Sequence, residues 1–191
     1  MNYEKVGVVG AKGWVGRSMM QLFPTARGYD LGDGLGSTSG HFVKSIEDLA
    51  DRDFNFICVP TPQKDSGQCD TSFVEEVAGT LHSINPSSIL VIRSTVEIGT
   101  TDRLARELSH KVVFQPEYLG ETPQHPFLDP RMRLFVILGG EKESVMDVAD
   151  LYKTVYNADV AYHFADARTA ELCKYMENSF LAAKVILCNE F

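Results

Sequence analysis

The strongest constraint on the fold is the regular alternation of short apolar runs with amphipathic stretches along the 191 residues. The apolar runs, which we expect to be strands, are residues 5–9, 54–59, 88–93, 112–115, 134–138 and 160–163, and residues 27–31 are a further short strand candidate. The stretches expected to be helical are residues 14–23, 45–50, 71–83, 100–109 and 143–156. Continuous apolar runs are typical of parallel strands buried on both faces. The pattern therefore predicts an α/β fold with a doubly wound, mostly parallel sheet of the Rossmann type.

Residues 165–191 contain neither proline nor glycine, so they predict one long helix after the last strand. On this helix Lys174 and Asn178 are four residues apart, and their side chains therefore project from one face. A lysine and a carboxamide held in this way can bind a hydroxyl or carbonyl oxygen on a carbon that loses or gains a hydride. The boundary between the sheet and this helix lies near residues 163–165.

A glycine-rich loop follows the first predicted strand and opens the first predicted helix. Its glycines have the spacing G-x-x-G-x-x-G, which is one position away from the dinucleotide fingerprint G-x-G-x-x-G. Glycines at such a turn let the backbone approach a diphosphate, which the helix N-terminus then binds. We therefore expect the cofactor-binding residues of this loop to be Gly10, Gly13, Trp14, Val15 and Gly16. The alternative is a glycine turn required only for packing the helix on the strand.

An acidic residue at the end of the second predicted strand should bind the ribose hydroxyls of the dinucleotide. Asp30 is the preferred candidate and Asp33 is the alternative. A carboxylate at this place accepts hydrogen bonds from the ribose of NAD and would repel the 2′-phosphate of NADP, so we predict NAD. Asp30 could also simply begin a turn.

Three further predicted strands end in unusual segments. These are residues 58–62 (C-V-P-T-P), 93–101 (R-S-T-V-E-I-G-T-T) and 115–121 (Q-P-E-Y-L-G-E). Each segment by itself is more often a turn or a helix cap than a site. In a doubly wound sheet, however, ligands bind outside the carboxyl ends of the strands. Three such segments at that edge together indicate a ligand site.

Taken in order, these segments resemble the UDP-glucose/GDP-mannose dehydrogenase family. The matching segments are residues 13–16 (G-W-V-G), 59–62 (V-P-T-P), 94–100 (S-T-V-E-I-G-T), 116–121 (P-E-Y-L-G-E), 138–140 (L-G-G), 170–178 (A-E-L-C-K-Y-M-E-N), 180–182 (F-L-A) and 189–190 (N-E). The resemblance covers essentially the whole chain. It implies oxidation of the 6-hydroxyl of a nucleotide-linked hexose to a carboxylate, with NAD as the acceptor in two hydride steps.

The resemblance also implies roles for single residues. Thr61 and Thr95 would line the nicotinamide end, and Thr95 would help to order a proton-relay water. Glu117 matches the catalytic glutamate of the family, while Lys174 and Asn178 would stabilise the developing oxyanion by charge and by a hydrogen bond. The predicted catalytic residues are therefore Thr95, Glu117, Lys174 and Asn178. The predicted cofactor-binding residues outside the glycine loop are Asp30, Val59, Thr61, Pro62, Thr95 and Glu121.

The sequence departs from the family pattern in three ways. Ala11 replaces the first glycine of the loop, and Thr122 stands where the family usually has a glycine. The family also has a downstream loop with a nucleophilic cysteine, which captures the aldehyde for the second oxidation. None of the four cysteines here lies in such a loop. We therefore expect an NAD-binding domain at residues 1–164, the start of the central helix at 165–191, no sugar-nucleotide domain, and partial or partner-dependent activity.

The remaining expectations concern partners and location. Exposed apolar residues of the last helix would favour a homodimer through it; they are Phe180, Leu181, Val185, Ile186 and Leu187. The net charge of −8 argues against a nucleic-acid partner. The sequence shows no signal peptide, no membrane-spanning stretch, no C-x-x-C pair and no metal ligands that we can assign, so we expect a cytoplasmic protein. The alternative functions are a non-catalytic NAD-binding module and a hydroxyacid dehydrogenase of the 3-hydroxyisobutyrate type.

Overall fold

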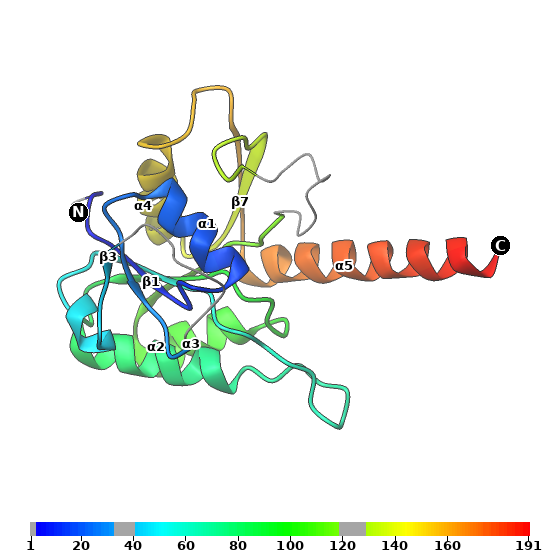
Figure 1. The fold of residues 1–191 in the computed structure, drawn as a ribbon, viewed down its shortest axis with the longest axis horizontal. Helices are drawn as coiled ribbons and strands as arrows, with labels where there is room; N and C mark the ends of the chain where they lie inside the picture. Colours follow the sequence, from blue (N-terminus) through cyan, green and yellow to red (C-terminus); the bar gives the residue numbers. More distant parts are fainter. Residues whose placement is uncertain (1–2, 33–40, 119–128) are drawn as a thin grey trace.

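One mixed sheet forms the centre of the structure, a computed structural model that describes residues 3–32, 41–118 and 129–191 (Figure 1). Within these residues the sheet has eight strands in the order β3-β2-β1-β4-β5-β6-β7-β8. The strands are β1 (Val6–Val9), β2 (Arg27–Tyr29), β3 (His41–Phe42), β4 (Phe54–Ile57), β5 (Ile89–Ile92), β6 (Lys111–Phe114), β7 (Phe135–Gly140) and β8 (Ala161–Ala165). The helices are α1 (Trp14–Leu22), the 3₁₀ helix η1 (Ile46–Leu49), α2 (Ser72–Ile84), α3 (Thr100–Leu108), α4 (Lys142–Lys153) and α5 (Ala167–Glu190).

The pairing of the strands confirms the predicted doubly wound, mostly parallel sheet. Every neighbouring pair from β3 to β6 is parallel. Strand β7 runs antiparallel to β6 and parallel to β8. Helices α1 and α4 cover one face of the sheet, and α2 and α3 cover the other (Figure 1). The sheet is therefore the middle of three layers.

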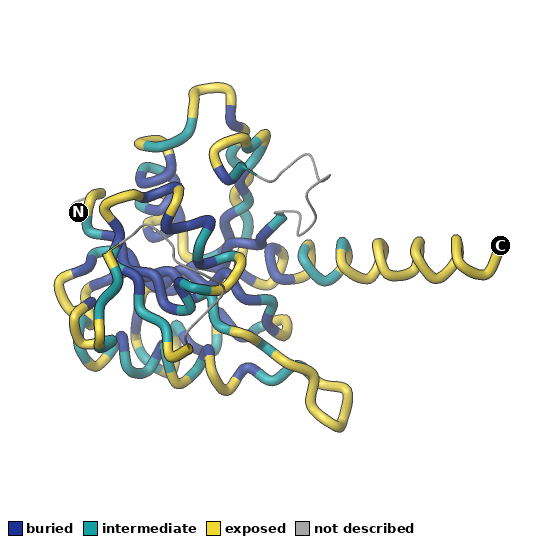
Figure 2. The backbone as a smooth tube through the Cα atoms, viewed as in Figure 1, coloured by how far each residue is buried: buried dark blue, intermediate teal, exposed yellow. Residues whose placement is uncertain are grey.

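Alternating side chains of the central strands bury both faces of the sheet. In β4, Phe54 and Phe56 pack in the cluster under α1 and α4, whereas Ile57 packs in the cluster under α2 and α3. Strand β5 alternates in the same way, because successive side chains of a strand point to opposite faces. Figure 2 shows the result as a dark blue centre beneath more exposed helices and loops. This double burial explains the uninterrupted apolar runs in the sequence.

The predicted elements are found, with ends that differ by up to three residues. At the start of the short helix η1, the Ser45 amide donates to Asp48 Oδ2 at 3.3 Å, as in a capping box. Strand β3 was not predicted: it has only two residues, one of them exposed, so no apolar run marks it. Residues 33–40, between β2 and β3, and residues 119–128, between β6 and β7, lie outside the described residues.

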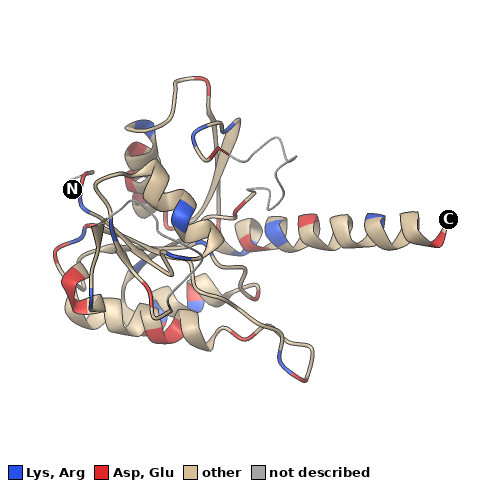
Figure 3. Cartoon of the chain, viewed as in Figure 1, with Lys and Arg blue, Asp and Glu red and all other residues tan. Residues whose placement is uncertain are grey.

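Helix α5 leaves the sheet and projects away from the rest of the chain (Figure 1). Asp166 caps it by accepting a hydrogen bond from the Thr169 amide at 2.8 Å. Charged residues occur in its first half, whereas its second half is mostly uncharged (Figure 3). The apolar residues expected to be exposed there are exposed: Phe180, Leu181, Val185, Ile186 and Leu187. No helix in the described ranges has both the length and the apolar character needed to cross a membrane.

A buried histidine predicts that the fold loses stability in acid. The Nδ1 atoms of His82 and His110 are 3.0 Å apart. Burial, and next the charge of His82, lower the pKa of His110 from 6.5 to about 4. The unfolded chain protonates this histidine near its pKa of 6.5, and the folded chain only near pH 4. Between pH 6.5 and pH 4 the unfolded chain therefore binds more protons, so the free energy of unfolding falls as the pH is lowered. We expect a loss on the order of 1 kcal/mol from pH 7 to pH 5, after allowance for solvent screening.

Urea unfolding of the wild type and of His110→Asn at pH 7 and at pH 5 measures this contribution. The variant removes the titrating ring, so its stability should fall less than that of the wild type over this range. Because the carboxylates titrate alike in both proteins, their effect cancels in the difference. An equal loss in both proteins would show that His110 contributes nothing.

Candidate active site

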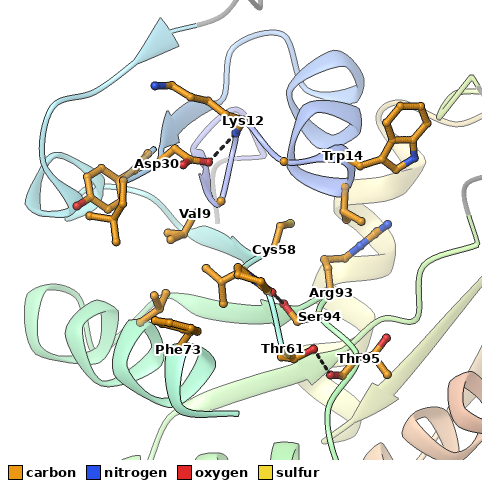
Figure 4. Close-up of a pocket in the computed structure, with 18 of the residues that line it drawn as sticks. Val9, Lys12, Trp14, Asp30, Cys58, Thr61, Phe73, Arg93, Ser94 and Thr95 are labelled. Atoms are coloured by element: carbon orange, nitrogen blue, oxygen red, sulfur yellow. Dashed lines mark hydrogen bonds between the residues drawn. The ribbon is translucent and has the colours of Figure 1, made fainter. Parts of the chain in front are cut away.

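A cavity of about 1020 Å³ lies beyond the carboxyl ends of β1, β2, β4 and β5 (Figure 4). Its wall consists of the loops after these strands, Glu117 after β6, and side chains of η1, α2 and α5. In Figure 4, Lys12, Asp30 and Phe73 lie toward one side of the cavity, and Trp14, Arg93 and Thr95 lie toward the other. The cavity thus lies at the edge of the sheet at which the sequence predicted a ligand site.

The glycines of the loop after β1 are needed for its geometry. Gly10 has φ +80°, and a Cβ atom there would lie 2.5 Å from the backbone oxygen of Cys58. A Cβ atom on Gly16 would overlap the carbonyl oxygen of Gly10 and lie 2.7 Å from Ala11 Cα. The loop therefore folds tightly against the first turn of α1 only because these positions have no side chain.

The N-terminus of α1 opens at this loop. Gly13 is the N-cap residue, without a side chain to accept from the first amides, and no acidic residue occurs in the first turn. The first N–H groups of a helix have no partner inside it. Trp14 and Val15 line the cavity at this end of the helix. These amides and the helix dipole are suited to an anionic group such as a diphosphate.

The departure at Ala11 is explained by a glycine on the next strand. Ala11 is fully buried. Its Cβ atom would lie only 2.7 Å from a Cβ atom on Gly28. Gly28 thus provides the space that the methyl group of Ala11 occupies, and the loop keeps its path: the amides of Gly10 and Ala11 both donate to the carbonyl oxygen of Tyr29, at 3.0 and 3.2 Å.

Asp30 lies at the end of β2 and lines the cavity. One carboxylate oxygen accepts from the backbone amide of Lys12 at 2.8 Å (Figure 4), and the other accepts from the amide of Gly32 at 3.0 Å. It therefore shapes the glycine loop and its own turn while it lines the cavity, and its binding to a ribose stays a prediction. The alternative candidate, Asp33, lies outside the described residues.

The loops after β4 and β5 are joined by side-chain hydrogen bonds. Thr61 Oγ1 donates to the carbonyl oxygen of Thr95 at 2.7 Å, and Ser94 Oγ donates to that of Val59 at 2.6 Å (Figure 4). Pro62 does not line this cavity; it lines a smaller one of about 260 Å³, which also touches Thr61 and Thr95. The two threonines therefore form the wall between the two cavities.

The structure brings all four predicted catalytic residues, Thr95, Glu117, Lys174 and Asn178, to the same cavity as the glycine loop. Glu117 is buried and pairs with Arg93 and Arg133. Lys174 Nζ lies 3.2 Å from Glu177 Oε2 and 4.9 Å from the ring centroid of Tyr118. Burial, together with nearby Glu177 and Cys173, raises the pKa of Tyr118 to about 12, so its ring stays neutral beneath the ammonium group. A cation, a paired carboxylate and a carboxamide thus line the same cavity.

Most of the predicted cofactor-binding residues also line this cavity: Gly10, Gly13, Trp14, Val15, Asp30, Val59, Thr61 and Thr95. Gly16 does not, and its contribution is the close packing of α1 on the loop. Glu121 lies outside the described residues. The structure therefore gathers most of the predicted site residues, and Pro62 and Gly16 are the ones it does not place on the main cavity wall.

Sequence reasoning missed Arg93 and Glu171 as parts of this region. Arg93 is buried, lines the cavity, and donates to Gln115 Oε1 at 2.5 Å and to the Tyr152 hydroxyl at 2.9 Å. Glu171 is completely buried in α5. The available signal for Arg93 was a charged residue directly after the apolar run of β5, and nothing in the sequence distinguishes Glu171 from the other charged residues at the start of α5.

The chain is similar to known dehydrogenases in sequence. The sequence model for the NAD binding domain of the UDP-glucose/GDP-mannose dehydrogenase family matches residues 36–158. The chain is 34% identical over 152 residues to the UDP-glucose 6-dehydrogenase of Rickettsia bellii, a match that covers 75% of this chain and 34% of that protein. It is 28% identical over 151 residues to the UDP-N-acetyl-D-mannosamine dehydrogenase of Methanocaldococcus jannaschii, with 73% and 34% covered.

The fold is similar to that of solved dehydrogenases. A UDP-glucose dehydrogenase from Pyrobaculum islandicum superposes with a TM-score of 0.82 at 26% identity, covering 97% of this chain and 51% of that one. The chain therefore spans about a third of the length of these curated relatives and about half of this solved chain.

Proposed function

The chain belongs to the UDP-glucose/GDP-mannose dehydrogenase family, and from this premise we propose that it binds NAD and oxidises the 6-hydroxyl of a nucleotide-linked hexose. The family assignment makes NAD the cofactor of this domain. The observation that carries the proposal is that Thr95, Glu117, Lys174 and Asn178 line one cavity with the glycine loop. UDP-glucose is the first substrate to test, because several of the relatives are UDP-glucose 6-dehydrogenases.

The residues of the cavity fit NAD. The amides at the start of α1 suit its diphosphate, and Asp30 suits the hydroxyls of a ribose. Apolar side chains line the same cavity as Asp30, among them Ile46, Phe73 and Val77, and they suit an adenine ring. When bound, NAD accepts the hydride that leaves C6 of the sugar. Its nicotinamide would be placed by Thr61 and Thr95, at the end of the cavity next to Lys174.

Lys174 and Asn178 would supply the chemistry on the side of the sugar. Loss of the hydroxyl proton and of a hydride from C6 creates an aldehyde, and negative charge develops on the oxygen before the hydride leaves. The ammonium group of Lys174 stabilises that oxygen, and the carboxamide of Asn178 donates a hydrogen bond to it. The proton passes to solvent, through a water molecule that Thr95 helps to hold.

Incubation of the chain with NAD and UDP-glucose, GDP-mannose or UDP-N-acetylmannosamine tests the proposal by the appearance of NADH. NADH formed with a nucleotide sugar supports it. Binding of NAD without turnover of any sugar would favour the non-catalytic module. Turnover of small hydroxyacids alone would favour the dehydrogenase of the 3-hydroxyisobutyrate type, which also pairs a lysine with an asparagine four residues later.

The ratio of NADH to sugar tests whether these residues complete one oxidation or two. Of the four cysteines, all of them described, only Cys58 lines the cavity. Burial raises the pKa of its thiol to about 12, so almost no thiolate is available to capture the aldehyde. We expect the 191-residue chain to release an aldehyde and one NADH per sugar. Two NADH per sugar from these residues alone would contradict this expectation.

We also propose that residues 1–164 form the NAD-binding domain and that the protein is cytoplasmic. We further propose that two copies of the chain form a dimer through the exposed half of α5. Phe180 and Ile186 are each 64% exposed, and burying them in a dimer would remove apolar surface from water. Sedimentation velocity at micromolar concentration should show a dimer. The variant Ile186→Glu should shift it toward the monomer, and a monomeric wild type would rule out this interface.

A further inference from the structure

Glu171 is a buried acid with a specific set of partners at another helix. Its side chain is completely buried in the early part of α5. Oε2 accepts from the Gly99 amide at 2.5 Å, and Oε1 accepts from the Thr101 amide at 2.8 Å and the Thr101 hydroxyl at 2.6 Å. These donors form the N-terminus of α3, where a negative charge is favourable. A buried carboxylate is costly unless hydrogen bonds compensate for its lost hydration, so these contacts fix the two helices to each other.

The partners of Glu171 belong to the segment that carries Thr95. Residues 93–99 connect β5 to α3; Gly99 is the N-cap residue of that helix, and Thr101 lies in its first turn. Near its other end, the segment is held by the loop between β4 and α2. The carbonyl oxygen of Thr95 accepts from Thr61 Oγ1 at 2.7 Å and from Cys69 Sγ at 3.5 Å. The path of this segment is thus fixed at Thr95 by the loop after β4 and at Gly99 by α5.

Glu171 also shares its side of α5 with the two residues that face the cavity. Lys174 and Asn178 follow it by three and seven positions, which places all three along one face of a helix. Close approach of α5 to the sheet is possible because β7 has Gly139 here: a Cβ atom on it would lie 2.9 Å from the Asp166 carbonyl oxygen and 3.1 Å from Ala167 Cα. One carboxylate therefore links the Thr95 segment to the helix that presents Lys174.

We propose that Glu171 is a positioning residue that holds Lys174 at a fixed distance from Thr95. The inference rests on the proposed function for its catalytic consequence, since Thr95 would face the nicotinamide and Lys174 the reacting oxygen. A shift of α5 by a fraction of an ångström would misplace the ammonium group while leaving the glycine loop intact, and small misplacements of a catalytic group lower the rate strongly.

Two variants weaken the link without creating a cavity. Glu171→Gln keeps the shape of the side chain but turns an NH₂ group toward an N–H donor. Thr101→Val removes only the hydroxyl that donates to Oε1. We expect kcat to fall about 10-fold in the first variant and about 3-fold in the second, with Kd for NAD within 2-fold of the wild type. Amide hydrogen exchange should become faster at residues 99–101 and at 170–175 together.

Asp166→Ala is the matched control. It removes the cap of the same helix, where Asp166 accepts from the amide and hydroxyl of Thr169, both at 2.8 Å, but it does not touch the Thr95 segment. It should lower the melting temperature by a few degrees and speed exchange at the start of α5. Exchange at residues 99–101 and kcat should stay at wild-type values.

The outcomes separate this inference from the proposed function. If the wild type turns over no nucleotide sugar, the proposed function fails, and the exchange data still decide whether Glu171 joins the two segments. Unchanged exchange at residues 99–101 in Glu171→Gln overturns the inference. So does a loss of kcat that simply follows melting temperature across Glu171→Gln, Thr101→Val and Asp166→Ala, because Glu171 would then have only a structural role.

Discussion

Replacement of Lys174 by alanine is expected to lower kcat for oxidation of the nucleotide sugar by about 10²–10³-fold, the range typical for loss of one group that stabilises an oxyanion. Lys174 lines the cavity next to Asn178, and no other lysine of α5 does so. The affinity for NAD should stay within about 2-fold of the wild type, because the glycine loop and Asp30 are unchanged. Steady-state kinetics and a binding titration with NAD measure the two quantities separately.

The fold should survive this substitution. The ion pair of Lys174 with Glu177 is partly exposed at 3.2 Å, and pairs of this kind contribute about 0–1 kcal/mol. Lys184→Ala is the matched control, since Lys184 lies on the same helix over the ring of Phe180 and away from the cavity. It should leave kcat unchanged. Equal losses of NAD affinity and kcat in Lys174→Ala would show that the lysine supports the structure and has no role in hydride transfer.

The second large effect is expected from Gly16→Ala, which should weaken NAD binding at least about 10-fold. The new Cβ atom would overlap the carbonyl oxygen of Gly10, and because that oxygen is backbone, the start of α1 must move away from the loop. The amides that would bind the diphosphate then lose their common direction. Trp14 is the single tryptophan of the chain and lines the cavity, so its fluorescence reports the titration with NAD.

Gly79→Ala provides the control for adding a methyl group to a helical glycine. A Cβ atom on Gly79 in α2 has nothing within 4 Å. This variant should bind NAD as the wild type does and should be more stable by about 0.5–1 kcal/mol, because alanine is the better helix former. Wild-type affinity in Gly16→Ala would mean that the glycine loop does not hold the diphosphate.

The fold was largely predictable because both faces of its sheet are buried. The run of residues 54–59 is apolar except for Asn55, and in the structure its apolar residues alternate between two separate cores. Strand β3 was not predictable, since two residues paired with β2 leave no periodic signal. The observed ends of the strands differ from the predicted ends by up to two residues, because the apolar pattern continues past the last residue that pairs in the sheet.

The site was predictable where it consists of strand ends and short motifs. Asp30, Thr61, Thr95 and Glu117 follow strands, and the carboxyl ends of parallel strands meet at one edge. The contacts of Glu171 were not predictable, because its partners Gly99 and Thr101 are 72 and 70 residues away along the chain. The sequence also did not predict that Phe73 and Ile46 line the cavity, since apolar residues near the start of a helix have the same sequence pattern as core residues.

The most direct test of the account is a crystal structure of the chain with NAD. We predict the diphosphate at the amides of residues 14–16, a ribose on Asp30, and the nicotinamide between Thr95 and Lys174. A dinucleotide bound elsewhere, or a cavity that stays empty at saturating NAD, would contradict it.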